Sequence, residues 1–391
     1  MSKVSALLVF LALGCGDDVR PANDGGPTPD VPTSDTGFDA AVDAAPMDAS
    51  RDALVDARTR DAAGDAMVSD ASPDSGTEAC PPHVTCVTRF PFVHSDSTAT
   101  SSRSDIARYD CAPDVDESGP ERWYRVDVPH DGFLALSLSE LGEGVDVDVH
   151  LLEESESCVD RGHWRAGAFV EAGRYWAVVD SWVDGVPLSG AYTLNAGLTS
   201  VDDFVTAGVE RSVAERAMRV FSRAWELGET DRLEYAIIDF SLHSVQPREW
   251  IFDLATGEHL WTLFVSHGMG SSDPADPGLA TTFSNIPESH QSSLGLLRTG
   301  ELYVGDFGPS HRLDGLEPGI NDNVRSRDIV MHPWNGSRQE FIDEWGYTQP
   351  TWGCPSIDDR LADEVRQVMA NGALMWFWAP DPAFVGASEY L

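Results

Sequence analysis

Residues 15–79 are the feature that most limits what this chain of 391 residues can fold into. They carry 15 Asp or Glu residues against 4 Arg, a net charge of −11, and almost no large apolar side chains. Nine of the aspartates recur every four or five positions in an alanine-rich background that prolines interrupt. On a helix these carboxylates would stack as like charges, so a solvated, self-repelling coil is favoured. A folded core therefore has to come from residues 80–391.

The segment before this stretch has the pattern of an export signal. Lys3 precedes an apolar run, Val4 to Leu13, which suits a signal-peptide core and is too short to span a bilayer of about 30 Å. The run ends in Leu-Ala-Leu-Gly-Cys, which resembles a bacterial lipobox with Cys15 as the lipidated residue. The next residue is Gly16 rather than the aspartate associated with inner-membrane retention.

We therefore expect a lipoprotein signal peptide at residues 1–14 and a disordered tether at residues 15–79. The lipid on Cys15 would attach the chain to the membrane, most simply to the outer membrane with the protein facing the periplasm. The cell surface is the alternative location.

The charge of the chain excludes several kinds of chemistry. Its 65 acidic and 26 basic residues give a net charge of −39, which rules out a nucleic-acid clamp, so we expect no nucleic-acid partner. All basic residues but Lys3 are arginines, so a processed chain contains no lysine. Schiff-base, Ser–Lys and P-loop lysine chemistry are then excluded, and arginine alone supplies cationic contacts.

The remaining five cysteines divide into a cluster and one distant residue. Cys80, Cys86, Cys111 and Cys158 indicate two disulfides, and the sequence leaves all three connectivities open. Cys354 follows 196 residues later and is either a liability or a working nucleophile. Because neither a CxxC-type metal motif nor an HExxH motif is present, we expect no metal and no cofactor.

Residues 80–200 have the pattern of short strands. Apolar and polar residues alternate in five segments, namely Trp123–Val128, Gly132–Leu138, Val145–Leu151, Gly173–Val179 and Gly190–Leu194. This pattern predicts a small, disulfide-stapled β-sandwich. The run WYRVDVPHDGFLALSLSE…VDVDVHLLE…AGRYWAVVDSW…GAYTLNA also resembles the bacterial pre-peptidase C-terminal domain, an accessory module of secreted enzymes. Asp146 and Asp148 fit a solvated strand face better than a calcium site, and the ligand of this domain is left open.

Residues 205–391 show a mixed, mainly β pattern. An amphipathic helix is predicted from Val209 to Leu227, and a late helix from Arg360 to Asn371, closed by Gly372. Strands are predicted at Leu233–Phe240, Trp250–Leu254, Leu260–Val265, Leu302–Val304 and Ile329–Met331. The expected fold class is therefore mainly β with two domains, the sandwich followed by a β-rich catalytic domain with flanking helices.

His332, at the end of a predicted strand, and Cys354, in Thr-Trp-Gly-Cys-Pro, are the candidate catalytic pair. A thiol with a pKa of about 8.5 is only partly ionised at neutral pH, and an imidazole raises its thiolate content and moves its proton. Gly353 permits a tight turn and close approach of a substrate. The N–H groups beside Cys354 are candidate donors to an oxyanion. By spacing alone, a structural role for the pair is favoured over a catalytic one.

Four blocks of sequence between residues 235 and 377 resemble a murein L,D-transpeptidase catalytic domain, in the branch with proline after the cysteine. They are YAIIDFSLHS, LFVSHGMGSS, FSNIPESHQSSLGLLRTGELYVGDFGPSHRLDGLEPGINDNVRSRDIVMH and TWGCPSI. The resemblance implies an active-site cysteine at Cys354, a base at His332, and a β-rich fold that places both in one cleft.

The same resemblance implies acyl transfer on peptidoglycan stem peptides, with loss of terminal D-alanine and formation of 3–3 cross-links. Water as acceptor would instead make the protein an L,D-carboxypeptidase. A non-catalytic lipoprotein that binds the cell wall is the alternative from a different class. The expected function is the transpeptidase; the sequence does not choose between an amine and water as acceptor, nor does it indicate the preferred stem peptide or the oligomeric state.

The chain departs from this family pattern where the family recognises its substrate. Pro355 and Ser356 stand where the wider family carries an arginine after Gly-Cys, and Pro333-Trp334 follows the histidine. Substrate binding is therefore expected elsewhere, with an arginine fork suited to a carboxylate; the candidates are Arg312, Arg325, Arg327, His267 and His311. The arginines are equally suited to surface pairs with Asp314, Asp322 or Asp328. For each histidine taken alone, a structural role is favoured.

Overall fold

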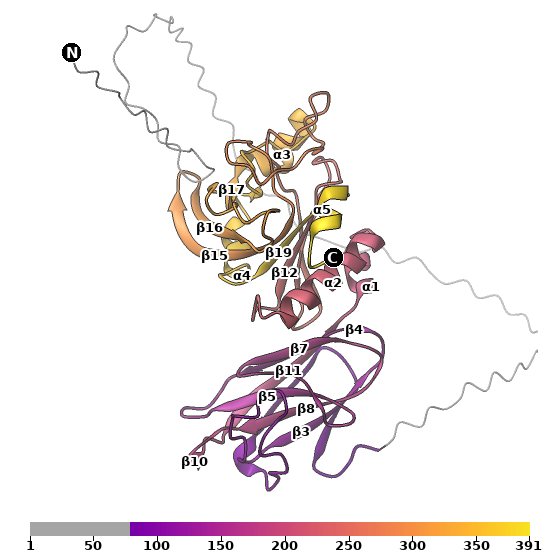
Figure 1. Ribbon diagram of the computed structural model, residues 1–391, viewed down its shortest axis with the longest axis vertical. Helices are drawn as coiled ribbons and strands as arrows, with labels where there is room; N and C mark the ends of the chain where they lie inside the picture. Colours follow the sequence, from indigo (N-terminus) through magenta and orange to yellow (C-terminus); the bar gives the residue numbers. More distant parts are fainter. Residues whose placement is uncertain (1–78) are drawn as a thin grey trace, which may run out of the picture. The chain divides into compact units, whose positions relative to one another are not determined.

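Two β-rich parts follow one another along residues 79–391, which are the residues that the computed structural model describes (Figure 1). The expected signal peptide, the lipidated Cys15 and nearly all of the expected tether lie outside the described residues. Residues 80–391 belong to one compact unit. Among residues 79–391, no helix is both long enough and apolar enough to cross a membrane.

The first part is the expected β-sandwich. One sheet has the strand order β1-β3-β8-β5-β6 and the other β2-β11-β4-β7. Every pairing in them is antiparallel except that of β1 with β3. The strands are β1 Val84–Val87, β2 Phe92–Ser97, β3 Arg122–Val128, β4 Gly132–Ser139, β5 Val147–Glu153, β6 Cys158–Gly162, β7 Arg165–Val170, β8 Gly173–Ser181 and β11 Ala191–Thr199, with a small ribbon of β9 Val183–Asp184 and β10 Val186–Pro187.

The alternating segments form strands because every second side chain of each enters the core between the two sheets. Val126, Leu134, Leu136, Val149 and Leu151 are all fully buried in this shared core. All five strands predicted for the sandwich are present, with boundaries shifted by a few residues. Period-two burial of this kind is what sheet-on-sheet packing requires.

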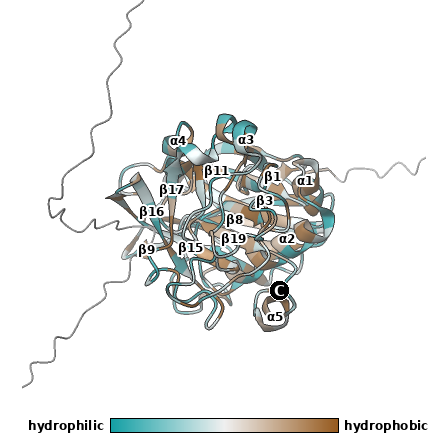
Figure 2. Ribbon diagram, turned by 90° about the horizontal axis from the view of Figure 1, so that it is seen from above, coloured by the Kyte–Doolittle hydropathy of each residue, from teal (hydrophilic) through white to brown (hydrophobic). Residues whose placement is uncertain are grey.

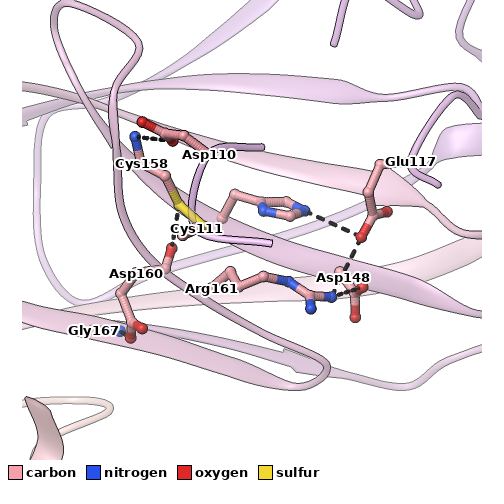
Figure 3. The surroundings of a disulfide bond; sticks show 9 residues. Asp110, Cys111, Glu117, Asp148, Cys158, Asp160, Arg161 and Gly167 are labelled. Atoms are coloured by element: carbon pink, nitrogen blue, oxygen red, sulfur yellow. Dashed lines mark hydrogen bonds and ion pairs between the residues drawn. A yellow bond between two sulfur atoms is a disulfide. The ribbon is translucent and has the colours of Figure 1, made fainter. Parts of the chain in front are cut away.

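Two disulfides staple the sandwich, joining Cys80 to Cys86 and Cys111 to Cys158. The second ties the long segment before β3 to the start of β6, where the Cys158 N–H donates to Asp110 at 3.0 Å (Figure 3). Beside it, the guanidinium of Arg161 contacts both Asp148 and Glu117. The pair of disulfides selects one of the three connectivities that the sequence left open.

The second part is an eight-stranded sheet with the order β14-β13-β12-β19-β15-β16-β17-β18. Its strands are β12 Glu234–Asp239, β13 Glu249–Asp253, β14 Glu258–Leu263, β15 Gly295–Gly305, β16 Gly308–Gly315, β17 Val330–Trp334, β18 Ser356–Asp358 and β19 Leu374–Trp378. The helices are α1 Val201–Thr206, α2 Arg211–Glu226, α3 Gln339–Trp345, α4 Ala362–Val368 and α5 Pro382–Ala387. The expectation of a β-rich domain with flanking helices is confirmed.

Helix α2 forms because its apolar residues recur every three or four positions. Figure 2 shows both apolar and polar residues along this helix. The carboxylate of Glu210 caps its first turn by accepting from the N–H groups of Ser212 and Val213. Phe221, on the buried face, meets Phe133 of β4 edge to face at 4.9 Å. The helix therefore packs against both β-rich parts of the chain.

The prediction for the late helix is wrong at its end. Helix α4 stops at Val368, four residues before Gly372. Gly372 does adopt a positive φ of 103°, but its N–H donates to the carbonyl of Thr299 at 2.8 Å, in the turn that leads into β19. Pairing with the neighbouring strand, rather than a helix cap, fixes this glycine.

Candidate active site

Parallel pairing of β17 with β18 brings the two candidate catalytic residues together. His332 on β17 is the register partner of Ser356 on β18, and Cys354 lies two residues before Ser356. The N–H of His332 points to the carbonyl of Pro355 at 3.4 Å. The N–H of Val330, two residues before His332, donates to the Cys354 sulfur at 3.3 Å. The sulfur is thus held against the strand that carries the histidine.

Cys354 is fully buried, and its sulfur lies 3.7 Å from the carbonyl oxygen of Asp328. Cys354 is disulfide-bonded in this structure. Only the reduced form of Cys354 can act as a nucleophile, because a thiolate and not a disulfide attacks a carbonyl carbon.

Gly353 is required by the backbone at this turn. Its φ is +119°, and a Cβ on it would lie 2.7 Å from the carbonyl oxygen of Gln291. The N–H of Gly353 donates to the Thr351 hydroxyl at 3.2 Å, and that hydroxyl donates to the carbonyl of Cys354 at 2.8 Å. The expected tight turn is therefore present, and the close neighbour is the protein's own backbone rather than a substrate.

The N–H groups that flank Cys354 do not form the expected oxyanion hole. The N–H of Gly353 is used by Thr351, and Pro355 has no N–H. An oxyanion contact through the N–H of Cys354 itself stays a prediction.

The ring of His332 is held as a neutral imidazole. Its Nδ1 lies 2.9 Å from the carbonyl of Pro333, which assigns the proton to Nδ1 and leaves the Nε2 lone pair as the acceptor. Phe307 stacks on the ring at 4.3 Å between centroids, and Trp334 meets it edge-on at 5.9 Å. Burial lowers the pKa of His332 to about 4, against the opposing hydrogen bond to Pro333. At neutral pH the ring is ready to accept a proton.

A loop that the sequence reasoning did not single out forms the wall beside Gly353. The Ser292 hydroxyl donates to the carbonyl of Gly353 at 3.3 Å and accepts from the N–H of Gly268 at 3.0 Å. The ring of His290 stacks on Trp352 at 4.7 Å. The polar run Glu-Ser-His-Gln-Ser-Ser around these residues was the available signal.

Two of the three candidate arginines are occupied by carboxylates of the protein. Arg325 bonds to both oxygens of Glu301, at 2.9 and 3.0 Å, and to Asp314. Arg312 donates to Asp328 at 2.7 Å and lies over the ring of Tyr303. The surface pairs weighed from the sequence therefore exist for both residues, and their forks do not face an open site.

Arg327 has a different role from the expected one. It is 7% exposed and donates to two serine hydroxyls and two carbonyl oxygens, those of Ser284, Ser289, Gln291 and Ser293, at 2.5 to 3.2 Å. Burial lowers its pKa to about 10. The guanidinium of Arg327 holds the 284–293 loop, whose Gln291 carbonyl lies against Gly353. It is therefore not placed to bind a substrate carboxylate.

The two other candidate histidines are enclosed by internal hydrogen bonds. His267 is fully buried between Arg248, at 2.7 Å, and Ser272, at 3.0 Å, and burial together with the charge of Arg248 lowers its pKa to about 3. The ring nitrogens of His311 each lie 3.0 Å from a backbone carbonyl, those of Gly300 and Arg366. Both rings therefore take part in hydrogen bonds that support the fold.

Within residues 79–391, the groups with metal-ligand spacing lie in the sandwich and not beside His332. They are Cys111 with His150 and Cys158, and Asp146 with Asp148 and His163. The first includes a disulfide, and in the second both aspartates contact the ring of His163. Neither contributes to the candidate active site.

Comparisons with known proteins place a family on the second part of the chain. Residues 206–378 match the family model described as L,D-transpeptidase catalytic domain. No curated protein matches the chain.

Similar solved structures include an L,D-transpeptidase from Stackebrandtia nassauensis, at 10% identity over 44% of this chain and 67% of that one, with a TM-score of 0.24. The LD transpeptidase LdtMt1 in complex with imipenem matches at 10% identity over 64% of this chain and 99% of its own, with a TM-score of 0.23. The pre-peptidase C-terminal domain of a collagenase from Bacillus anthracis matches at 17% identity over 30% and 99%, with a TM-score of 0.21. TM-scores this low support no conclusion about this chain.

The family match and the β-rich fold agree with the resemblance drawn from the sequence blocks. An L,D-transpeptidase domain implies a cysteine transferase, with peptidoglycan as its substrate and the cell envelope as its location. Residues 206–378 of this chain are therefore an L,D-transpeptidase catalytic domain.

Proposed function

We propose that Cys354 is the nucleophile and the Nε2 atom of His332 the base in acyl transfer between peptidoglycan stem peptides. The observation that carries the proposal is the β17–β18 register, which ties the Cys354 sulfur to the N–H of Val330 two residues from His332. The neutral state of the His332 ring supports it, because only a neutral imidazole accepts the thiol proton.

In the first half-reaction the Cys354 thiol gives its proton to His332 Nε2 while its sulfur attacks the carbonyl that precedes the terminal D-alanine. A C–S bond forms, and the C–N bond to D-alanine then breaks. His332 returns the proton to the departing amine, which leaves a thioester and free D-alanine. In the second half-reaction an amine of another stem peptide attacks the thioester, releases the thiol and completes a 3–3 cross-link. Water in place of the amine gives trimmed stems only.

Mass spectrometry of muropeptides distinguishes the three candidate functions. We expect reduced full-length protein to produce 3–3 cross-linked dimers and D-alanine from isolated peptidoglycan, and Cys354→Ala and His332→Ala to produce neither. Trimmed stems without dimers would identify a carboxypeptidase. Binding of peptidoglycan with no new product from the reduced wild type would identify a non-catalytic binder and contradict the proposal.

We also propose that the chain is anchored through a lipid on Cys15 and faces the periplasm from the outer membrane. The apolar run after Lys3, its Leu-Ala-Leu-Gly-Cys end and the following Gly16 support this. Incorporation of a labelled fatty acid should be lost in Cys15→Ser. An unlabelled wild type, or a label that persists in the variant, would contradict anchoring at this residue.

A further inference from the structure

A pocket of about 440 Å³ lies where the β6–β7 hairpin meets the end of α2. The two-residue turn of the hairpin, His163 and Trp164, contributes to it from the sandwich. Trp225 of α2 and Asp231, which follows the helix, contribute from the catalytic domain. Its volume lies in the range of about 300–1,000 Å³ that small-molecule sites occupy. None of these residues has a part in the chemistry proposed for Cys354.

Two tryptophans give the pocket an aromatic lining. Trp164 is 56% exposed although it stands on a short hairpin, and its backbone carbonyl accepts the N–H of Leu138 at 2.7 Å, which fixes the turn. Trp225 is half-buried, and its indole N–H donates to Asp160 at 2.9 Å. The indole of Trp164 meets the ring of His163 at 5.9 Å between centroids, and its exposed part offers a flat apolar face to a ligand.

Acidic and basic side chains both surround these two rings. One oxygen of Asp160 accepts from Trp225 and from the N–H of Gly167, at 2.9 and 2.8 Å, so the carboxylate is fixed in place. Arg165 donates through one nitrogen to the carbonyl of Asp231 at 3.1 Å, which also ties the hairpin to the segment after α2. Fixed carboxylate oxygens accept from hydroxyls, and guanidinium nitrogens donate to hydroxyl or carbonyl oxygens.

We infer that this pocket binds the sugar strand of peptidoglycan, as a β-linked oligosaccharide of N-acetylated amino sugars. A sugar ring offers an apolar C–H face to Trp164 and a rim of hydroxyl and acetamido groups to the carboxylates and arginines. A bare peptide or an anion would use only part of this lining. The inference rests on the proposed function, because that function places the domain on stem peptides that such strands carry.

The test is calorimetric titration of the full-length Cys354→Ala protein, which cannot turn over substrate, with a hexamer of β-linked N-acetylglucosamine and with peptide-free glycan strands. We expect both probes to bind, and Trp164→Ala in the same background to weaken binding about tenfold through loss of one stacked ring. Trp345→Ala is the matched control, since Trp345 is 54% exposed at the end of α3 and packs against Phe341, outside the pocket. It should leave the affinity unchanged.

Two results would overturn the inference. One is absence of binding by either probe, and the other is equal binding by the Trp164 and Trp345 variants. Failure of the proposed function looks different, since inactivity of the reduced wild type towards stem peptides leaves these titrations unaffected.

Discussion

At the scale of single residues, the state of His332 decides how the site works. Its ring lies between Phe307 and Trp334 and is 2% exposed. Burial disfavours the charged imidazolium, which is why the pKa of His332 falls to about 4 from its usual value near 6.5. The residue is therefore a neutral but weak base, and proton transfer has to accompany attack by the sulfur rather than precede it.

This pKa predicts the pH dependence of the reaction. The acid limb of kcat/KM should fall near pH 4, because His332 is inactive only when protonated. Phe307→Ala admits water to the ring and should move that limb upward, towards pH 6.5, since charged histidine is then better solvated. Stopped assays of D-alanine release from pH 3 to 9 measure both. A wild-type limb at pH 6.5, unmoved in the variant, would refute the neutral-histidine description.

Gly353→Ala should lower the free energy of unfolding by about 3 kcal/mol and abolish activity, because a positive φ and a contact with Gln291 both oppose a side chain. Gly346→Ala is the control, since Gly346 has a φ of +81° but nothing within 4 Å of an added Cβ. Its cost should be about 1 kcal/mol, with activity retained. Urea denaturation measures both costs. Similar losses for the two variants would show that the contact with Gln291 is unimportant.

At the scale of elements, Arg327 links the 284–293 loop to the turn that carries Cys354. Its hydrogen bonds reach carbonyl and hydroxyl oxygens 34 to 43 residues earlier in the sequence. Gln291, one of those partners, presses on Gly353. No spacing in the sequence encodes such a contact. Arg327 was therefore expected either to bind a substrate carboxylate or to form a surface pair.

Removing this fork should loosen the loop. Arg327→Ala should cost about 3 kcal/mol of stability, because several buried acceptors lose their donor at once. Arg325→Ala, which removes only exposed ion pairs, should cost under about 1 kcal/mol. Thermal unfolding of the two variants side by side gives the comparison. A larger loss for Arg325→Ala would contradict the role assigned to Arg327.

The sandwich strands that sequence patterns predicted are those in which every second side chain enters the core between the two sheets. Alternation located β3, β4, β5, β8 and β11, and the helical repeat located α2. It missed β19, whose five residues Leu374–Trp378 are all buried, so that no alternation exists to be seen. It also missed β18, which has three residues and matters because its register places Cys354 beside β17. The family resemblance predicted that Cys354 and His332 line one cleft. How β17 and β18 pair to bring Cys354 close could be learned only from the fold.

At the scale of the whole molecule, buried titratable groups of two kinds set the response to pH. Burial lowers the pKa of His150 and His267 to about 3 and that of His332 to about 4. Burial raises the pKa of Glu117 and Glu249 to about 8 and that of Asp180 to about 9. The histidines contribute stability above about pH 6.5 that is lost as the pH falls towards 3. The carboxyl groups contribute stability at low pH that is lost as the pH rises through 8 to 9.

The two effects oppose each other between about pH 4.5 and 6.5, where the unfolded chain has protonated histidines and ionised carboxyl groups. Above pH 6.5 only the carboxyl groups contribute a slope, so stability should fall by several kcal/mol between pH 6.5 and 9. Guanidinium titrations at pH 5.5 and 8.5 test this. Asp180→Asn removes one of the buried acids and should make the alkaline loss smaller. Equal or greater stability at pH 8.5 in the wild type would contradict the prediction.

The nucleophilic role of Cys354 is the central claim, and intact-mass spectrometry of the reduced protein tests it most directly. After incubation with a stem tetrapeptide and no acceptor amine, the wild-type mass should rise by that of the peptide acyl group without D-alanine, and proteolysis should map the adduct to Cys354. His332→Ala should acylate far more slowly, and Cys354→Ala should show no adduct. An unmodified wild type whose thiol is shown to be reduced, or an equal adduct on Cys354→Ala, would contradict the account.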